Sequence, residues 1–204
     1  MQAVKTLPAH YAETDAINLA ENKRLAFSLS IVGFLLFFFF ALLFTVLAAV
    51  LRYNVAGDEL ELRITGSNIG ETLVVVACLV ALTVIIHELI HALFFRIFTG
   101  EWARFNVKGL YAYAAAPDWY LPRNLHVAIA LAPLVLISVV GMVLILLVPL
   151  ALLWGVLLCL VVNAAGAIGD IAIAGWLLTK PSNAYVNDYG DGFAVYTTQR
   201  GVVR

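Results

Sequence analysis

The run His87-Glu88-Leu89-Ile90-His91 places two imidazoles and a carboxylate at a spacing that suits metal-dependent hydrolysis. On an α-helix, residues four positions apart are separated by one turn and by roughly 40° around the axis, so both imidazoles can reach one metal ion. Glu88 lies beside them to transfer a proton. Residues 72–86 carry no formal charge, and ionisable groups at membrane depth are costly and usually functional. The pattern predicts a zinc enzyme with its site inside a bilayer.

The elements that position this motif are long apolar helices. Of the 204 residues, 63% are hydrophobic and 12% are charged, and the mean hydropathy is +0.98. This composition indicates an integral membrane protein, and no basic stretch suggests nucleic acid binding. We expect an all-α polytopic membrane protein with four transmembrane helices and a small cytoplasmic β-hairpin-like insertion. The predicted spans are 25–51, 72–98, 126–147 and 151–178, where Pro149 interrupts the last long apolar stretch.

The distribution of basic residues predicts the orientation. Ten of the twelve Lys and Arg residues lie in the predicted tails, in the segment after the second span or, for Arg96, at the inner end of that span. The first external loop holds only Arg52 and Arg63. By the positive-inside rule, both termini face the cytoplasm, in a multi-pass protein of the cell membrane. Residues 1–24 and 179–204 are then cytoplasmic tails that flank a core of residues 25–178.

Two polar segments alternate polar and apolar residues, as extended strands do, and a third has strand character after a turn signal. Residues 59–64 are expected to form a strand or ribbon in the outer loop. Residues 102–113 are expected to form a hairpin directly after the metal-binding helix, although an amphipathic loop at the membrane surface is the alternative. Residues 193–196 follow a Gly-Asp-Gly turn signal and have strand character.

A third metal ligand is needed, because a catalytic zinc ion normally has three protein ligands and an open position. Among the downstream carboxylates, only Asp170 lies within a predicted span. Counting helical rise from the outer surface puts His87 about 22 Å deep and Asp170 about 28 Å deep, at the level of His91. Asn163, two turns above Asp170, is either a site residue or an interhelical hydrogen-bonding group. His126 is interpreted as an interfacial histidine at the start of the third span.

These motifs resemble the site-2 protease family of intramembrane zinc metalloproteases, and most closely the small bacterial group of zincin peptidases. The resemblance rests on the HELIH motif, on Asn163 to Asp170 in a later span, on Leu131-Ala132-Pro133, and on an Asp-then-Gly-Phe element at Asp188 and Gly192. The chain departs from the site-2 pattern at Gly166 and Ile171, where that family has Pro and Gly, and its Asn-to-Asp spacing is one residue shorter.

The resemblance implies that His87, His91 and Asp170 bind one Zn²⁺ and that Glu88 is the general base. It also implies that the hairpin receives an unwound membrane-protein substrate. Phe105, Val107 and Tyr111, together with Asn163, are therefore the candidate substrate-binding or supporting residues. A membrane metal transporter and a catalytically silent membrane-binding pseudoprotease are the rival interpretations.

Overall fold

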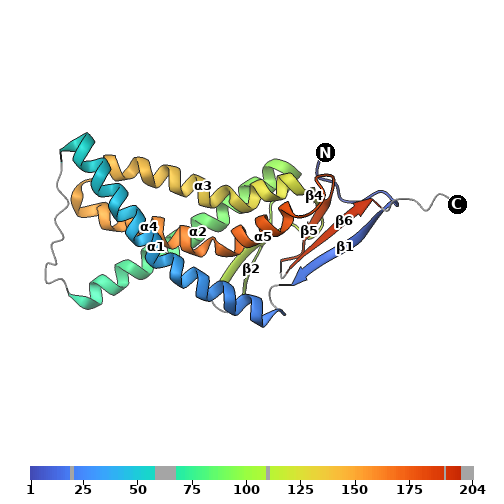
Figure 1. The fold of residues 1–204 in the computed structure, drawn as a ribbon, viewed down its shortest axis with the longest axis horizontal. Helices are drawn as coiled ribbons and strands as arrows, with labels where there is room; N and C mark the ends of the chain where they lie inside the picture. The colour runs from blue at the N-terminus through green and yellow to red at the C-terminus, as the bar shows by residue number, and fades with distance from the viewer. Residues whose placement is uncertain (19–20, 58–67, 109–110, 191, 199–204) are drawn as a thin grey trace. The chain divides into compact units, whose positions relative to one another are not determined.

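The computed structural model describes residues 1–18, 21–57, 68–108, 111–190 and 192–198. Four long apolar helices, each long enough to cross a membrane, dominate the chain, as the composition predicts. They are α1 (Lys23–Ala56), α2 (Ile69–Thr99), α3 (Arg123–Leu147), and a fourth that is divided into α4 (Leu150–Gly166) and α5 (Ile168–Leu178). Figure 1 labels these helices and most of the strands.

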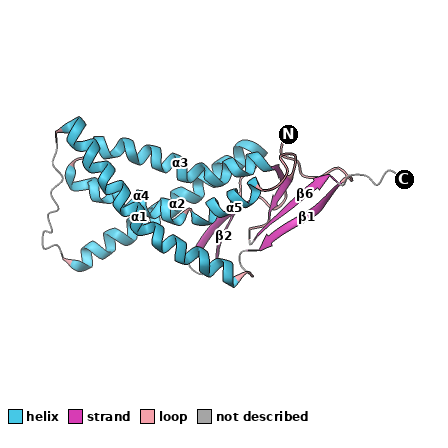
Figure 2. Cartoon of the chain, viewed as in Figure 1, coloured by secondary structure: helices cyan, strands magenta, loops and turns pink. Residues whose placement is uncertain are grey.

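The strands form two antiparallel sheets, so the expectation of an all-α protein with one hairpin-like insertion is too simple. The hairpin is confirmed as β2 (Arg104–Lys108) paired with β3 (Tyr111–Ala115). A second sheet has the order β1-β6-β5-β4 and is drawn in magenta in Figure 2. Its strands are β1 (Tyr11–Asn18), β4 (Tyr120–Pro122), β5 (Tyr185–Asp188) and β6 (Gly192–Thr198).

The four-stranded sheet is built largely from residues that the sequence pattern assigns to tails. Strand β1 pairs with β6, so that Tyr11 lies opposite Thr198, and β6 pairs with β5. The strand predicted at residues 193–196 is confirmed within β6. The strand predicted at residues 59–64 lies outside the described residues.

By its internal contacts the chain divides into two compact units. One contains residues 1–30, 88–132 and 169–204, and the other contains residues 31–87 and 133–168. Each long helix therefore contributes residues to both units.

The first unit holds both sheets and two apolar clusters. In one cluster Ala92 and Phe95 of α2 pack with Leu121 and with Ile129 of α3. In the other, Ile173 and Leu177 of α5 pack against the sheet residues Val186 and Val195. The helix that carries the metal motif is thus anchored in the same unit as the hairpin and the sheet.

The second unit is a helical cluster centred on α4. Phe44 and Ala48 of α1 pack with Leu160 and Ala164 of α4, and Gly141 of α3 leaves room for Leu160. The buried Arg52 of α1 donates through Nε to the carbonyl oxygen of Ile145 (2.6 Å) and through Nη2 to that of Val148. These carbonyls lie at the C-terminal end of α3, where the last carbonyl groups have no N–H donor within the helix. Arg52 therefore caps α3.

Candidate metal centre

His91 is held in one orientation by the backbone of α3. Its side chain is buried, and its Nδ1 lies 3.0 Å from the carbonyl oxygen of Ile129. A carbonyl oxygen can only accept a hydrogen bond, so Nδ1 carries the proton and the lone pair lies on Nε2. This is the tautomer that a metal-binding histidine needs.

Pro133 explains why the carbonyl of Ile129 is available. Within a helix, the carbonyl of Ile129 would accept the N–H of residue 133, four positions later. Position 133 is a proline inside α3 and has no N–H. The acceptor that proline releases is therefore the one that fixes His91.

Asp170 lies opposite the metal-binding nitrogen of His91. It stands in the first turn of α5, and its Oδ1 is 3.5 Å from His91 Nε2. Two ligands bound to one tetrahedral zinc ion at 2.0–2.1 Å are separated by about 3.3–3.4 Å. The observed separation of 3.5 Å is close to the one expected for two ligands of one ion, and it is long for a direct hydrogen bond.

His87 belongs to the second unit and is oriented there by Asn163. His87 Nδ1 lies 2.9 Å from Asn163 Oδ1, while Asn163 Nδ2 donates to the carbonyl oxygen of Pro133 (3.5 Å). Because a carbonyl oxygen can only accept a hydrogen bond, the amide nitrogen of Asn163 faces Pro133 and the amide oxygen faces His87. His87 therefore also carries its proton on Nδ1. Asn163, which is only 2% exposed, is thus placed to orient a candidate metal ligand.

The three predicted ligands form a group that could hold a metal ion. One ligand atom each from His87, His91 and Asp170 lies within 4.8 Å of the others. His87 ends one unit and Glu88 begins the other, but both lie in the uninterrupted helix α2, which sets His87 one turn before His91. Two imidazoles and one carboxylate are a donor set that suits zinc and leaves a position for water.

Glu88 is placed by the same helix. It precedes His91 by three positions, so the two side chains are neighbours on the helix surface. Its carboxylate is also close enough to act electrostatically on the Asp188 side chain. A base role for Glu88 fits this position and remains a prediction.

Two buried polar groups near the centre were not assigned to it by the sequence pattern. Asp188, at the end of β5, is within electrostatic range of His91 and Asp170, and burial raises the pKa of its carboxyl to about 7. The N–H of Gly190 donates to its Oδ1 (2.9 Å) and opposes that rise. A carboxyl group buried among charges of its own sign resists ionisation. The signal was the Asp-then-Gly-Phe element, whose spacing alone reveals no burial.

His126, which the sequence places at the membrane interface at the start of the third span, is enclosed by protein. It is 2% exposed, and its ring centroid lies 6.0 Å from that of Phe95 and 5.3 Å from that of Phe193. It lies one turn before Ile129 on α3. The packing of Phe193 against this ring depends on β6, which a local sequence pattern does not reveal.

Of the three hairpin residues predicted to contact substrate, Phe105 and Val107 turn their backbone N–H groups to the open edge of β2. Lys108 pairs with Tyr111, and only two residues separate them in the sequence. A pair that closes such a short loop is a hydrogen-bonded pair, in which the N–H and C=O groups of the two residues face each other. By alternation, the N–H groups of Phe105 and Val107 point away from β3, whereas the N–H of Tyr111 points towards β2. In the described part of the chain no third strand pairs with β2. Phe105 and Val107 therefore lie on an open edge, and Tyr111 does not offer its amide there.

The comparisons identify the family. Residues 80–185, more than half of the chain, match the family described as "Putative zincin peptidase", and the chain belongs to it. The matched region includes His87, Glu88, His91 and Asp170. No curated protein and no solved structure matches the chain. The family indicates a zinc-dependent metallopeptidase, and the group of two histidines and one aspartate is compatible with that activity.

Replacing Asn163 by leucine should weaken zinc binding by about 10- to 100-fold, the usual cost of removing a group that orients a metal-binding histidine. Leucine is similar in size but cannot accept the Nδ1 proton of His87. Affinity can be measured by competition with a chromogenic zinc chelator. Asn54→Leu, at an exposed position of α1 where the side chain bonds only within its own helix, is the matched control. Equal affinity in the two variants would show that Asn163 does not orient His87.

Replacing Pro133 by alanine should also weaken zinc binding, by about 10-fold. Alanine restores an N–H that competes with His91 for the carbonyl of Ile129. The same chelator competition reports the effect, and Pro149→Ala, at the start of α4, serves as the proline control. If Pro133→Ala binds zinc as tightly as the unaltered protein, the released carbonyl is not what fixes His91.

Proposed function

We propose that this chain is an intramembrane zinc metalloprotease of the site-2 protease type, which hydrolyses peptide bonds in membrane-protein substrates. The observation that carries the proposal is the group of His87, His91 and Asp170, in which Asp170 lies 3.5 Å from His91. It is supported by the zincin peptidase family and by the apolar character of every helix that supplies a ligand.

The chain's own residues account for the chemistry. One bound zinc ion would act as a Lewis acid and lower the pKa of a water molecule. His87, His91 and Asp170 hold that ion, while Asn163 and the carbonyl of Ile129 keep both imidazoles in the binding tautomer. Glu88 accepts a proton from the attacking water and delivers it to the nitrogen of the leaving peptide.

The proposed topology places both termini in the cytoplasm of a multi-pass cell-membrane protein. Its support is the bias of Lys and Arg in the sequence, because ten of the twelve belong to the segments assigned to that side.

The open edge of β2 is the proposed binding surface for an unwound substrate. An edge strand offers N–H and C=O groups to an extended peptide without reading its side chains. The edge belongs to the hairpin that begins five residues after the end of α2. Selectivity would then depend mainly on how easily a substrate helix unwinds.

Replacing Glu88 by glutamine should abolish cleavage while zinc content stays that of the unaltered protein. Glutamine keeps the shape of the side chain but cannot accept the proton, and loss of a general base costs about 10²- to 10⁴-fold in rate. Candidate single-span proteins can be co-expressed with each variant and followed by immunoblotting for an uncut form. Glu71→Gln, in the first turn of the same helix, is the control. Undiminished cleavage by Glu88→Gln would rule out the proposed mechanism.

Proline at Phe105 or Val107 should reduce turnover by about 10-fold or more and leave zinc content intact. Each substitution removes an N–H that points to the open edge, where proline is tolerated structurally. Alanine at the same positions keeps the N–H and should be milder. Proline at Tyr111 removes an N–H used inside the hairpin, so it should instead destabilise the hairpin. If cleavage survives proline at both outward positions, substrate does not add to β2.

A further inference from the structure

Residues 3–5 lie along the outer edge of the four-stranded sheet. Val4 and Tyr120 exchange two backbone hydrogen bonds, from Val4 N to Tyr120 O (3.0 Å) and from Tyr120 N to Val4 O (2.8 Å). Tyr120 begins β4, whose other side pairs with β5. We call residues 3–5 the strap. The strap therefore occupies the edge of β4 in the way that an added strand would.

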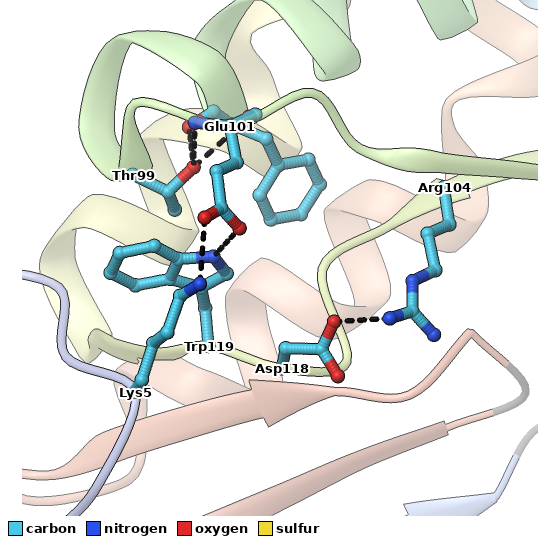
Figure 3. Close-up of polar contacts among 7 residues, drawn as sticks. Lys5, Thr99, Glu101, Arg104, Asp118 and Trp119 are labelled. Carbon is cyan, nitrogen blue, oxygen red and sulfur yellow. Dashed lines mark hydrogen bonds and ion pairs between the residues drawn. The ribbon is translucent and has the colours of Figure 1, made fainter.

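The next residue of the strap binds a carboxylate and an indole ring. Lys5 Nζ donates to Glu101 Oε1 (2.6 Å) and lies 5.1 Å from the centre of the Trp119 ring. Trp119 Nε1 donates to the other oxygen of Glu101 (3.0 Å). Figure 3 shows Lys5, Glu101 and Trp119 converging in this way. The hydrogen bond from Lys5 lowers the pKa of Glu101, and that from Trp119 adds to the effect, so Glu101 is ionised.

The groups that receive Lys5 are held in place without it. Thr99 Oγ1 donates to the carbonyl oxygen of Phe95 in its own helix (2.7 Å) and accepts a hydrogen bond from the N–H of Glu101 (3.1 Å). The Trp119 N–H donates to Glu101 as well. Ala3, on the other side of Val4, packs against the apolar cluster that contains Ala92 and Phe95. Along this edge the strap thus makes three successive contacts: an apolar contact at Ala3, backbone hydrogen bonds at Val4 and an ion pair at Lys5.

The strap is held weakly enough to be exchanged. The side chains of Lys5 and Glu101 are 53% and 54% exposed, and exposed ion pairs contribute little to stability. Among the described residues, the pairing with β4 is a single bridge at Val4. Such contacts open locally at low cost.

We propose that the edge of β4, Glu101 and Trp119 form a binding site for an extended peptide that carries a basic residue, and that the strap occupies this site within its own chain. This inference rests on the proposed function: the competing ligand is the basic segment next to the transmembrane helix of a substrate. Basic residues are enriched in cytoplasmic segments beside membrane spans. Thr99 lies eight residues after His91, about 12 Å along α2, a distance that about four extended residues cover.

The test is peptide binding to the full-length protein in detergent, which requires no cleavage. The probe is a fluorescent peptide with the sequence of residues 1–8, followed by anisotropy. In the unaltered protein the strap competes with the probe for the site at a millimolar effective concentration, because it belongs to the same chain. The double variant Val4→Pro/Lys5→Ala removes a backbone donor and the cation from the strap, so this competition ends. We expect the probe to bind this variant at least 10-fold more tightly than the unaltered protein.

Matched changes identify the contacts that matter. Adding Glu101→Gln to the double variant should weaken probe binding by about 5-fold, the upper range for an exposed ion pair. Adding Asp118→Asn instead should have no effect, because Asp118 pairs with Arg104 and not with the strap. A probe with glutamate in place of lysine should not bind. The proposal is overturned if the double variant binds no more tightly than the unaltered protein, or if Glu101→Gln and Asp118→Asn behave alike.

The zinc and cleavage measurements with Glu88→Gln test the proposed function separately. If Glu101→Gln weakens peptide binding but the protein cleaves nothing, the peptide site is supported. Its ligand is then not a protease substrate. If cleavage depends on Glu88 but the strap variant does not change probe binding, the peptide site is ruled out and the protease function is supported.

Discussion

The metal centre depends on one hydrogen bond that a helix does not make. Pro133 has no N–H, so the carbonyl of Ile129 is left for His91, and the carbonyl of Pro133 itself receives the amide of Asn163. Asn163 in turn accepts the Nδ1 proton of His87. Buried imidazoles need acceptors, and in an apolar environment an unmade hydrogen bond is expensive. The missing N–H of Pro133 therefore helps to orient His91, while the backbone carbonyl at the same position receives the asparagine that orients His87.

The two sheets pair the short polar segments that adjoin the apolar helices, so that the backbone groups of these segments are hydrogen-bonded. Strand β4 ends at Pro122 and α3 begins at Arg123, while β5 follows α5 after a short turn. Val186 and Val195 bury their side chains against Ile173 and Leu177 of α5. This packing fixes the helix that carries Asp170 to the sheet, so the position of the third ligand depends on residues far from it in sequence.

The sequence pattern predicted the parts of the site that follow from local geometry. The four-residue spacing of His87 and His91 implies a shared side of a helix, and the depth of Asp170 implied that it meets His91, as the 3.5 Å separation confirms. Strand β1 was missed because its partner β6 is about 180 residues away and its middle residues are polar and exposed. The acceptor for His91 was missed because it is a backbone atom, although Pro133 marked its position four residues later.

The same physical reasoning connects the edge of β4 to the metal centre. Tyr120, which pairs with Val4, and Ile129, which accepts the hydrogen bond of His91, are nine residues apart and are joined by the start of α3. Leu121, between them, is fully buried in the cluster that also contains Phe95 and Ile129. A packed core of this kind does not deform freely. Whatever occupies the edge of β4 is therefore linked, through a short and rigid stretch of chain, to the carbonyl that sets the orientation of His91.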